Sequence, residues 1–366
     1  MLIKIDNISI GNSNKCFVIA EAGVNHNGDI EKAYELIDAA VDANADAVKF
    51  QTFKTEEIAT IDAKQATYQK INMGKEESQY EMLKRLELSY QDFKNLKKYC
   101  DKKNILFMSA PHSCKEDVDL VAALCPVIKV PSGDLTNLPI LKYMAEKRIP
   151  IILSTGMSNM EEIKEALDII TPINKQLIIL HCTSNYPTPL NEVNLKAMKT
   201  IEKAFGFPVG YSDHTMGTEI TVASVAMGAC VVEKHFTLDR NLPGPDHKAS
   251  LEPNELKKMV NEIRNVEKRL TQGISPEKIL KELNLLDSMG DGVKKPQLSE
   301  IEVMRVARKS LVAAVNIPEY TIITEKMLAI KRPGTGLHPR NYWSLIGKKA
   351  KTNIKKDEML DIKMIA

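Results

Sequence analysis

Short apolar segments alternate with amphipathic segments along the first 270 residues of the chain. The apolar segments are rich in valine and isoleucine and do not alternate with polar residues, which is typical of parallel strands buried on both faces. They cover residues 16–22, 47–53, 105–110, 127–131, 151–155, 177–182, 209–212 and 230–236. Eight strand–helix units in roughly 250 residues predict an α/β fold, a closed (β/α)8 TIM barrel.

The helices of this barrel are predicted from segments that place apolar residues on one face. They cover residues 31–43, 92–103, 161–170, 192–204 and 217–227. A doubly wound open sheet is the alternative arrangement of alternating strands and helices. That alternative is disfavoured because no predicted strand is followed by the glycine pattern GxGxxG.

The composition excludes several classes of protein. The 366 residues carry a formal net charge of only +2, which argues against a nucleic-acid-binding surface. No apolar stretch approaches the length of about 18 residues that a membrane span needs, and the first residues lack a signal-peptide core. The six cysteines form no CxxC pair, as in reduced thiols. We therefore expect a cytoplasmic protein.

The sequence pattern changes after residue 270. We expect a barrel domain over 1–270, closed by a helix over 253–270, and a linker over 271–299 that contains a helical piece at 276–287. The linker ends in a turn-rich run at 290–296. Residues 300–366 are predicted to form a small second domain with short strands at 310–315 and 327–331. A domain of this size has a modest core, so a partner surface helps to stabilise it.

Two histidines occupy matching places at the ends of the seventh and eighth predicted strands. His214 follows the strand 209–212, and His235 lies near the end of the strand 230–236. Neighbouring strands of a barrel bring their carboxyl ends to the same rim, where such barrels keep their chemistry. The pair, flanked by Asp213 and Glu233, predicts an open metal site.

Two lysines lie inside predicted buried strands. Lys49 and Lys129 are costly there unless an anion pairs with them; the alternative interpretation is that each extends its amine to solvent from a strand end. Hydroxyl groups of Ser132 and Ser154 lie close by in the sequence, each near a glycine. This combination favours a phosphate or carboxylate site.

Further polar residues follow the other strands. Glu21 begins the polar loop after the first strand, and the turn at 244–248 follows the eighth, where we expect a substrate loop. A rim with two lysines, two histidines and carboxylates suits the joining of an anionic phosphate ester to a polar aldehyde. A metal ion polarises the carbonyl in such a reaction, and the lysines hold the anion.

Nine ordered motifs make the chain similar to the sialic acid synthase family nearly from end to end. They are AEAGVNHNG at 20–28, VKFQTF at 48–53, KVPSG at 129–133, STGM at 154–157, HCTSNYPTP at 181–189, SDH at 212–214, EKHFT at 233–237, GPDH at 244–247 and KRPG at 331–334. The resemblance implies a TIM barrel followed by an antifreeze-like (SAF, β-clip) domain, which acts as a lid over the substrate rather than as an ice binder.

The resemblance also implies roles for individual residues. His214 and His235 match the ligands of Mn²⁺ or Mg²⁺ and, with Glu21 and Glu233, form the catalytic set. The residues implied to hold phosphoenolpyruvate are Lys49, Lys129, Ser132, Ser154, Ser184 and Ser212. Ser184 stands where some members have asparagine. The residues implied to surround the acceptor sugar are Gln51, Tyr186, Asp246 and Arg332.

Arg332 matches an arginine that one subunit places in the barrel of its partner, where it meets the N-acetyl group of the sugar. The resemblance therefore implies a domain-swapped homodimer with shared active sites. A family asparagine in the loop after the second strand has no clean match, although Asn72 is nearby.

The implied activity is the condensation of phosphoenolpyruvate with an N-acetylated sugar, with C–O cleavage and release of phosphate. N-acetylmannosamine, giving N-acetylneuraminate, is our first expectation for the acceptor. The alternatives are 2,4-diacetamido-2,4,6-trideoxymannose, giving N,N'-diacetyllegionaminate, and the precursor of pseudaminate. Outside this activity, a Schiff-base aldolase with Lys129 as nucleophile and a sugar-sensing or ice-binding protein are the alternatives.

Overall fold

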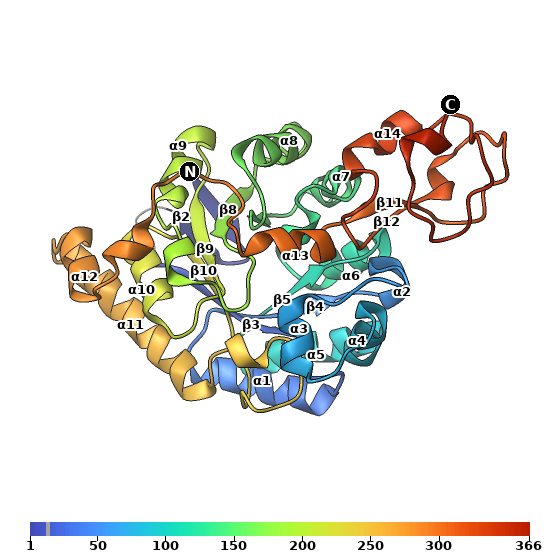
Figure 1. Ribbon diagram of the computed structural model, residues 1–366. Helices are drawn as coiled ribbons and strands as arrows, with labels where there is room; N and C mark the ends of the chain where they lie inside the picture. The colour runs from blue at the N-terminus through green and yellow to red at the C-terminus, as the bar shows by residue number, and fades with distance from the viewer. Residues whose placement is uncertain (12–14) are drawn as a thin grey trace.

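Eight parallel strands form the centre of the molecule in the computed structural model, which describes residues 1–11 and 15–366 (Figure 1). The strands are β3 (Phe17–Gly23), β4 (Ala47–Thr52), β5 (Leu106–Pro111), β6 (Ile128–Val130), β7 (Ile151–Ser154), β8 (Leu177–Cys182), β9 (Val209–Asp213) and β10 (Val231–His235). Hydrogen bonds join them in the order β5-β4-β3-β10-β9-β8-β7-β6. The outermost strands, β5 and β6, also lie in contact. The predicted TIM barrel is confirmed.

Helices surround the barrel (Figure 1). They are α1 (Ile30–Asp42), α5 (Tyr90–Lys103), α6 (Lys115–Leu124), α7 (Leu138–Glu146), α8 (Met160–Ile170), α9 (Ala197–Phe205), α10 (Glu219–Ala226) and α11 (Pro253–Thr271). Their apolar faces and the outward side chains of the strands form one large buried core. In α10 every residue from Ile220 to Ala226 is buried, because α11 and α12 (Pro276–Glu282) pack against it.

A hairpin at the N-terminus was not expected from the sequence. It consists of β1 (Leu2–Ile5) and β2 (Ile8–Gly11), paired antiparallel. Ile3, Ile5 and Ile10 pack against the inward side chains of the barrel in a second core, which includes Phe17 and Val231. Because these two residues begin their strands, the hairpin covers the amino-terminal end of the barrel, away from the predicted chemistry.

Three short helices between β4 and β5 were also not expected. They are α2 (Thr55–Ile58), α3 (Thr67–Met73) and α4 (Gln79–Leu86). Side chains from this insertion, among them Ile58, Met82 and Leu86, form a separate apolar cluster with Val24 of the first loop after a strand. The insertion thereby builds a wall at the carboxyl-terminal rim of the barrel.

The C-terminal part of the chain has a small core of its own. It contains α13 (Glu300–Ala307), β11 (Ser310–Ala313) paired antiparallel with β12 (Leu328–Lys331), and α14 (Tyr342–Leu345). It also contains three short 3₁₀ helices, η5 (Glu325–Met327), η6 (Pro339–Asn341) and η7 (Ile362–Met364). A fourth, η4 (Leu286–Met289), lies in the connection to the barrel. The domain boundaries at 270 and 299 stay a prediction.

The C-terminal part lies against the insertion at the rim of the barrel, with β12 beside α2 (Figure 1). The Arg332 N–H donates to the Ile58 carbonyl at 2.8 Å, and the Thr60 N–H donates to the Arg332 carbonyl at 3.0 Å. These backbone bonds bring the residue after β12 to the mouth of the barrel.

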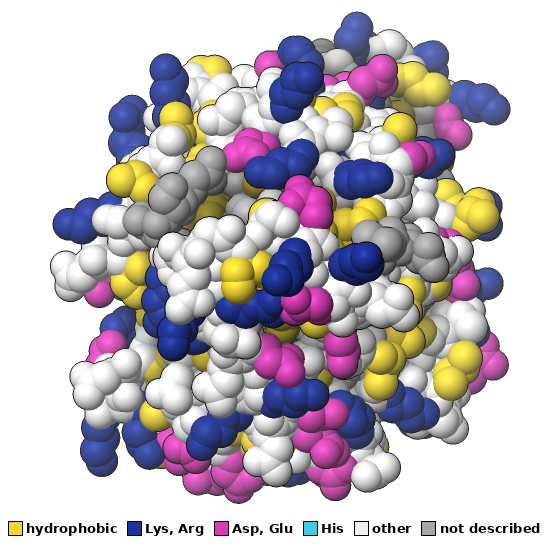
Figure 2. All heavy atoms as spheres, turned by 90° about the vertical axis from the view of Figure 1, so that its left-hand side faces the viewer, with side chains coloured by type: hydrophobic (Ala, Val, Ile, Leu, Met, Phe, Trp, Pro, Cys, Tyr) yellow, Lys and Arg dark blue, Asp and Glu magenta, His cyan; other side chains and the backbone are white. Residues whose placement is uncertain are grey.

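The surface carries charges of both signs. On the face in Figure 2, basic and acidic side chains are interspersed and do not gather into one patch. None of the helices in the described parts of the chain is long and apolar enough to cross a membrane.

Candidate active site

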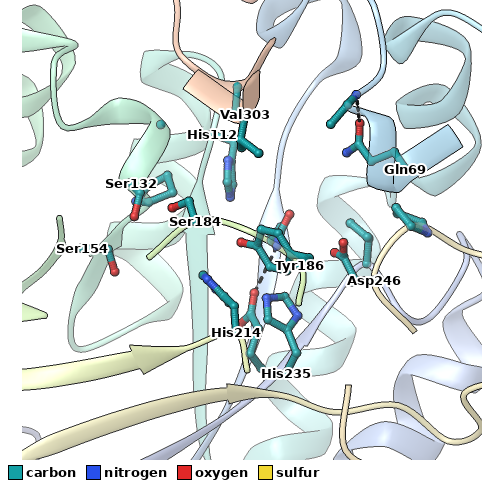
Figure 3. A pocket seen from close by; sticks show the side chains of 18 of the residues that line it. Gln69, His112, Ser132, Ser154, Ser184, Tyr186, His214, His235, Asp246 and Val303 are labelled. Atoms are coloured by element: carbon teal, nitrogen blue, oxygen red, sulfur yellow. Dashed lines mark hydrogen bonds between the residues drawn. The ribbon is translucent and has the colours of Figure 1, made fainter. Parts of the chain in front are cut away.

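One pocket lies at the carboxyl-terminal rim of the barrel, and all fourteen predicted site residues line it. They are Glu21, Lys49, Gln51, Lys129, Ser132, Ser154, Ser184, Tyr186, Ser212, His214, Glu233, His235, Asp246 and Arg332. Most of them come from the ends of strands or from the first residues beyond, as the barrel geometry requires. Figure 3 labels Ser132, Ser154, Ser184, Tyr186, His214, His235 and Asp246 around the same space.

Two lysines and two glutamates form a buried ion-pair network at the base of this pocket. The Lys49 amine lies 2.7 Å from Glu21 and 3.5 Å from Glu233, and the Lys129 amine lies 3.0 Å from Glu233. Gln51 donates to Glu21 at 3.1 Å, and Ser212 donates to Glu233 at 3.0 Å. The partner that each buried lysine needs is therefore a carboxylate of the same site.

The pKa values of the two carboxyls in this network are shifted in opposite directions. Burial raises the pKa of Glu21, and nearby Glu233 adds to the effect, although Lys49 opposes it. The pKa of Glu233 lies well below its usual range because Lys129 and Lys49 outweigh the effect of burial. Burial also lowers the pKa of Lys129. Two neighbouring carboxyls with pKa values pushed apart are typical of a site that moves protons.

The two predicted metal-binding histidines lie next to each other in the pocket, with ring centroids 5.5 Å apart. The Nδ1 of His214 lies 2.8 Å from the Thr183 carbonyl; as a donor there, it leaves Nε2 as the atom with the free lone pair. His235 Nδ1 is buried without a hydrogen-bond partner. Burial, reinforced by His214, holds the pKa of His235 well below its usual value, so this imidazole is neutral, as a metal ligand must be.

These imidazoles fit a divalent ion with an open coordination sphere. In residues 1–11 and 15–366, no three His, Cys, Asp or Glu side chains form a group that surrounds a metal ion. With the two imidazoles as its ligands, an ion here would leave its remaining positions to water or substrate oxygens. The orphaned Nδ1 of His235 is the observation that supports this fit.

Serine hydroxyls converge beside the lysines. Ser154 Oγ is buried without a partner, and Ser132 Oγ accepts a hydrogen bond from the Gly156 N–H at 3.0 Å. A Cβ at position 156 would lie 2.1 Å from Ser184 Oγ and 2.8 Å from Ser132 Oγ, so only glycine fits between these loops. The result is a set of hydroxyl donors next to two amines, which suits a phosphate.

Large side chains line another part of the pocket. Tyr186 lies between the rings of Tyr68 and His214, with centroid distances of 5.1 Å and 4.1 Å. Burial raises the pKa of Asp246 to about 6, and the charge of Glu21 adds to this. Arg332 Nε is buried without a partner, so it is available for a substrate oxygen.

Arg332 reaches the pocket of its own chain, whereas the resemblance placed it in a partner's barrel. The reason is the backbone pairing between residues 58–60 and Arg332 described above. Asn72 does not line the pocket. Its amide donates to the Pro245 carbonyl at 2.6 Å and so holds the loop at 244–248.

Four polar residues and one apolar group of the pocket were not predicted from the sequence. The polar residues are Tyr68, Gln69, Gln79 and His112. His112 lines the pocket directly after β5, and the predicted strand at 105–110 was a signal that could have found it. The apolar group comes from the unexpected insertion and α13 and had no such signal: its members include Met82, Leu83, Leu86, Val303 and Val306. Figure 3 labels His112 and Val303, which line the same pocket as the serines.

Comparisons with known proteins agree with this geometry. The NeuB family pattern matches residues 36–275, and the SAF domain pattern matches residues 308–366. This chain belongs to the NeuB family. It is thus an enzyme of the synthase type, and its C-terminal part is a SAF domain.

Two curated relatives span nearly the whole chain. N,N'-diacetyllegionaminic acid synthase of Campylobacter jejuni is 46% identical over 94% of this chain and 99% of its own length. The protein of the same name from Legionella pneumophila is 41% identical over 94% of this chain and 93% of its own length. The crystal structure of the spore coat polysaccharide biosynthesis protein SpsE of Bacillus subtilis superimposes with a TM-score of 0.83 at 32% identity, covering 100% of this chain and 99% of that one.

Proposed function

We propose that this chain condenses phosphoenolpyruvate with an open-chain N-acetylated sugar to give a nonulosonic acid and phosphate. The observation that carries the proposal is one pocket that holds Lys49 and Lys129 beside serine hydroxyls and the two imidazoles. The amines and hydroxyls match the carboxylate and phosphate of the enol ester. Tyr186, Asp246 and Arg332 lie where the sugar then extends.

The two carboxyls carry the protons of the reaction. Carbon 3 of phosphoenolpyruvate bonds to the aldehyde carbon while the protonated form of the Glu21 carboxyl gives its proton to the aldehyde oxygen. Water adds to carbon 2 and gives its proton to Glu233. Phosphate then leaves with cleavage of the C–O bond, takes the proton of the new hydroxyl and leaves a ketone. Transfer of a proton from Glu233 to Glu21 restores the starting state.

His214 and His235 would hold Mn²⁺ or Mg²⁺, and the ion supplies Lewis-acid polarisation of the aldehyde. Burial keeps the pKa of His235 low, which favours its neutral form. The pKa of His214 is raised instead, because Cys182 and the Thr183 carbonyl outweigh the effect of burial, so metal binding there releases a proton from the charged ring. Calorimetric titration of the chelator-treated protein with Mn²⁺ tests this assignment. One site that is lost in the double variant His214→Ala/His235→Ala supports it, and unchanged Mn²⁺ binding contradicts it.

For the acceptor we favour 2,4-diacetamido-2,4,6-trideoxymannose, so that the product is N,N'-diacetyllegionaminate. N-acetylmannosamine was our first expectation from the sequence, but both relatives above carry the legionaminic acid name at more than 40% identity. The apolar lining from Val24, Met82 and Leu86 also suits the methyl group of a 6-deoxy sugar better than a hydroxymethyl group.

Steady-state kinetics with three acceptors test the choice. We expect kcat/KM for the 2,4-diacetamido-2,4,6-trideoxymannose to exceed that for N-acetylmannosamine by about tenfold or more, since one missing polar or apolar contact changes specificity by that order. The acceptor of pseudaminic acid synthases serves as the third arm. A preference for N-acetylmannosamine, or similar values for all three, would contradict the legionaminate assignment.

A Schiff-base aldolase remains the competing enzyme class, because burial lowers the pKa of Lys129. Borohydride reduction in the presence of pyruvate distinguishes the two. Our proposal expects no covalent adduct and full activity afterwards. A pyruvyl adduct on Lys129 would favour the aldolase.

A further inference from the structure

Glu300, at the start of α13, has its side chain inside the protein beside the pocket but does not line it. It is 0% exposed. Its Oε1 accepts hydrogen bonds from the backbone N–H groups of Met157 at 2.6 Å and Ser184 at 2.7 Å, and its Oε2 accepts one from Gln297 at 2.8 Å. A residue that precedes the SAF domain thus binds the loops that follow two adjacent barrel strands, β7 and β8.

The loop after β7 needs such support. Met157 has φ of +60°, a left-handed conformation that costs a non-glycine residue free energy. Glu300 binds its N–H, and Arg308, at the other end of α13, donates to its carbonyl. Arg308 is itself fixed by Glu162, at 2.7 Å and 2.9 Å. Both backbone groups of the strained residue are therefore bound by the segment that joins barrel and SAF domain.

One of these two loops holds a hydroxyl of the anion site in place, and the other carries one itself. Gly156, next to Met157, donates to Ser132 Oγ at 3.0 Å, and Ser184 presents its own hydroxyl to the pocket. Figure 3 shows Ser132, Ser154 and Ser184 on one side of the pocket, with Val303 of α13 above them. Because a Cβ at Gly156 would touch Ser184 Oγ and Ser132 Oγ, a small shift of either backbone displaces these hydroxyls.

We propose that Glu300 is a positioning residue for the phosphate end of the pocket: its carboxylate fixes the N–H groups of Met157 and Ser184 and thereby aims the serine hydroxyls. This inference rests on the proposed function, since it assigns that end of the pocket to the phosphate of phosphoenolpyruvate. Glu300 touches no substrate in this scheme. It acts through the backbone of two loops.

The variant Glu300→Gln tests the proposal with little change of shape. Glutamine keeps one acceptor oxygen but presents an NH₂ group to a site that holds only N–H donors, so three charge-assisted bonds are weakened or lost. We expect the Kd for phosphoenolpyruvate and for inorganic phosphate, measured by calorimetry, to rise by about tenfold. The KM for phosphoenolpyruvate should rise in parallel, while the KM for the sugar changes by less than about twofold.

Glu192→Gln is the matched control. Glu192 binds the Ser299 N–H at 3.2 Å and the Ser299 hydroxyl, so it anchors the start of the same helix without touching Met157 or Ser184. We expect this variant to keep the wild-type Kd for phosphoenolpyruvate. If Glu300→Gln yields no folded protein, Glu300→Asp serves instead, because it keeps the charge but is one methylene too short.

A wild-type Kd for phosphoenolpyruvate in Glu300→Gln would overturn the proposal. So would an equal loss in Glu192→Gln, since that loss would mean only that α13 has loosened. The measurement is separate from the proposed function. A protein that binds phosphoenolpyruvate but turns over none of the acceptors defeats the proposed reaction, while the comparison of Kd values still decides the role of Glu300.

Discussion

Lys129 contacts Glu233 through a buried ion pair at 3.0 Å, and Glu233 is shared with Lys49. Removing one amine therefore leaves its carboxylate with a second partner, so the fold should tolerate the change. In the proposed reaction the two amines act on the substrate as a pair, because an anion that enters the pocket meets both. Lys129 can therefore be replaced to test the anion site without a large loss of stability.

We expect Lys129→Gln to raise the KM for phosphoenolpyruvate by about 10- to 100-fold, because one charge-assisted contact to its phosphate or carboxylate is lost. Initial rates at saturating acceptor measure it. Lys257, which lies on the exposed side of α11, gives the control Lys257→Gln. A KM unchanged by Lys129→Gln would place the phosphate elsewhere.

His26 is a residue whose titration should affect stability. Its Nδ1 accepts a hydrogen bond from the Gly28 N–H at 3.0 Å, and burial lowers its pKa from 6.5 to about 4. The unfolded chain takes up this proton first. The stability that the neutral ring contributes is thus fully present above pH 6.5 and is lost as the pH falls toward 4.

The free energy of unfolding should accordingly fall by up to about 3 kcal/mol from this residue between pH 7 and pH 4. Urea titrations of wild type and His26→Gln, whose amide can still accept from Gly28, measure the difference. We expect the stability gap between the two to narrow as the pH falls. A gap that is constant with pH would show that His26 does not titrate in this way.

The polar residues at the strand ends could be predicted from the sequence, but the side chains that pair with them could not. A lysine inside an apolar strand predicts an anionic partner, but the sequence does not indicate that Glu21 and Glu233 are these partners. Glu300 was missed for the same reason. Its carboxylate acts on loops more than 100 residues away in the chain.

The hairpin β1–β2 is an element whose role is known only from the structure. Its inward residues fill the amino-terminal end of the barrel, away from the rim that carries the candidate active site. The barrel strands could be predicted because burial on both faces imposes an apolar pattern. The hairpin and helices α2 to α4 are too short to show a period, so their positions depend on contacts with a barrel that is already formed.

Ile5→Ala tests the hairpin. Ile5 is 0% exposed, and removing such a side chain costs about 2–5 kcal/mol through lost burial and the cavity left behind. We expect that loss of unfolding free energy in chemical denaturation, with KM and kcat unchanged at 25 °C. The exposed Ile8 gives the control Ile8→Ala. A changed KM for phosphoenolpyruvate in Ile5→Ala would mean that the hairpin shapes the site as well.

At the scale of the whole molecule, the SAF domain completes the pocket through Arg332. The same backbone pairing with residues 58–60 can form within one chain or between two, as in domain swapping. We propose the exchanged homodimer that the resemblance implied. The connection through residues 290–299, which contains no helix or strand, is where the two arrangements would diverge.

Mixing two inactive variants distinguishes these arrangements. Arg332→Ala is combined with His214→Ala/His235→Ala after unfolding and refolding together. In an exchanged dimer we expect about a quarter of the wild-type activity, since half of the dimers are mixed and each then has one complete site. Refolded wild type is the control for recovery. No regained activity would place Arg332 in the barrel of its own chain.

In the proposed reaction, one rim of the barrel brings an enol phosphate to an N-acetylated sugar aldehyde, and the C–O bond of the ester breaks. The most direct test uses phosphoenolpyruvate labelled with ¹⁸O in the oxygen that bridges carbon 2 and phosphorus. We expect phosphate to form only when the acceptor sugar is present and all of the label to leave with the phosphate. Label retained in the sugar acid, or phosphate released at the same rate without acceptor, would rule out the proposed reaction.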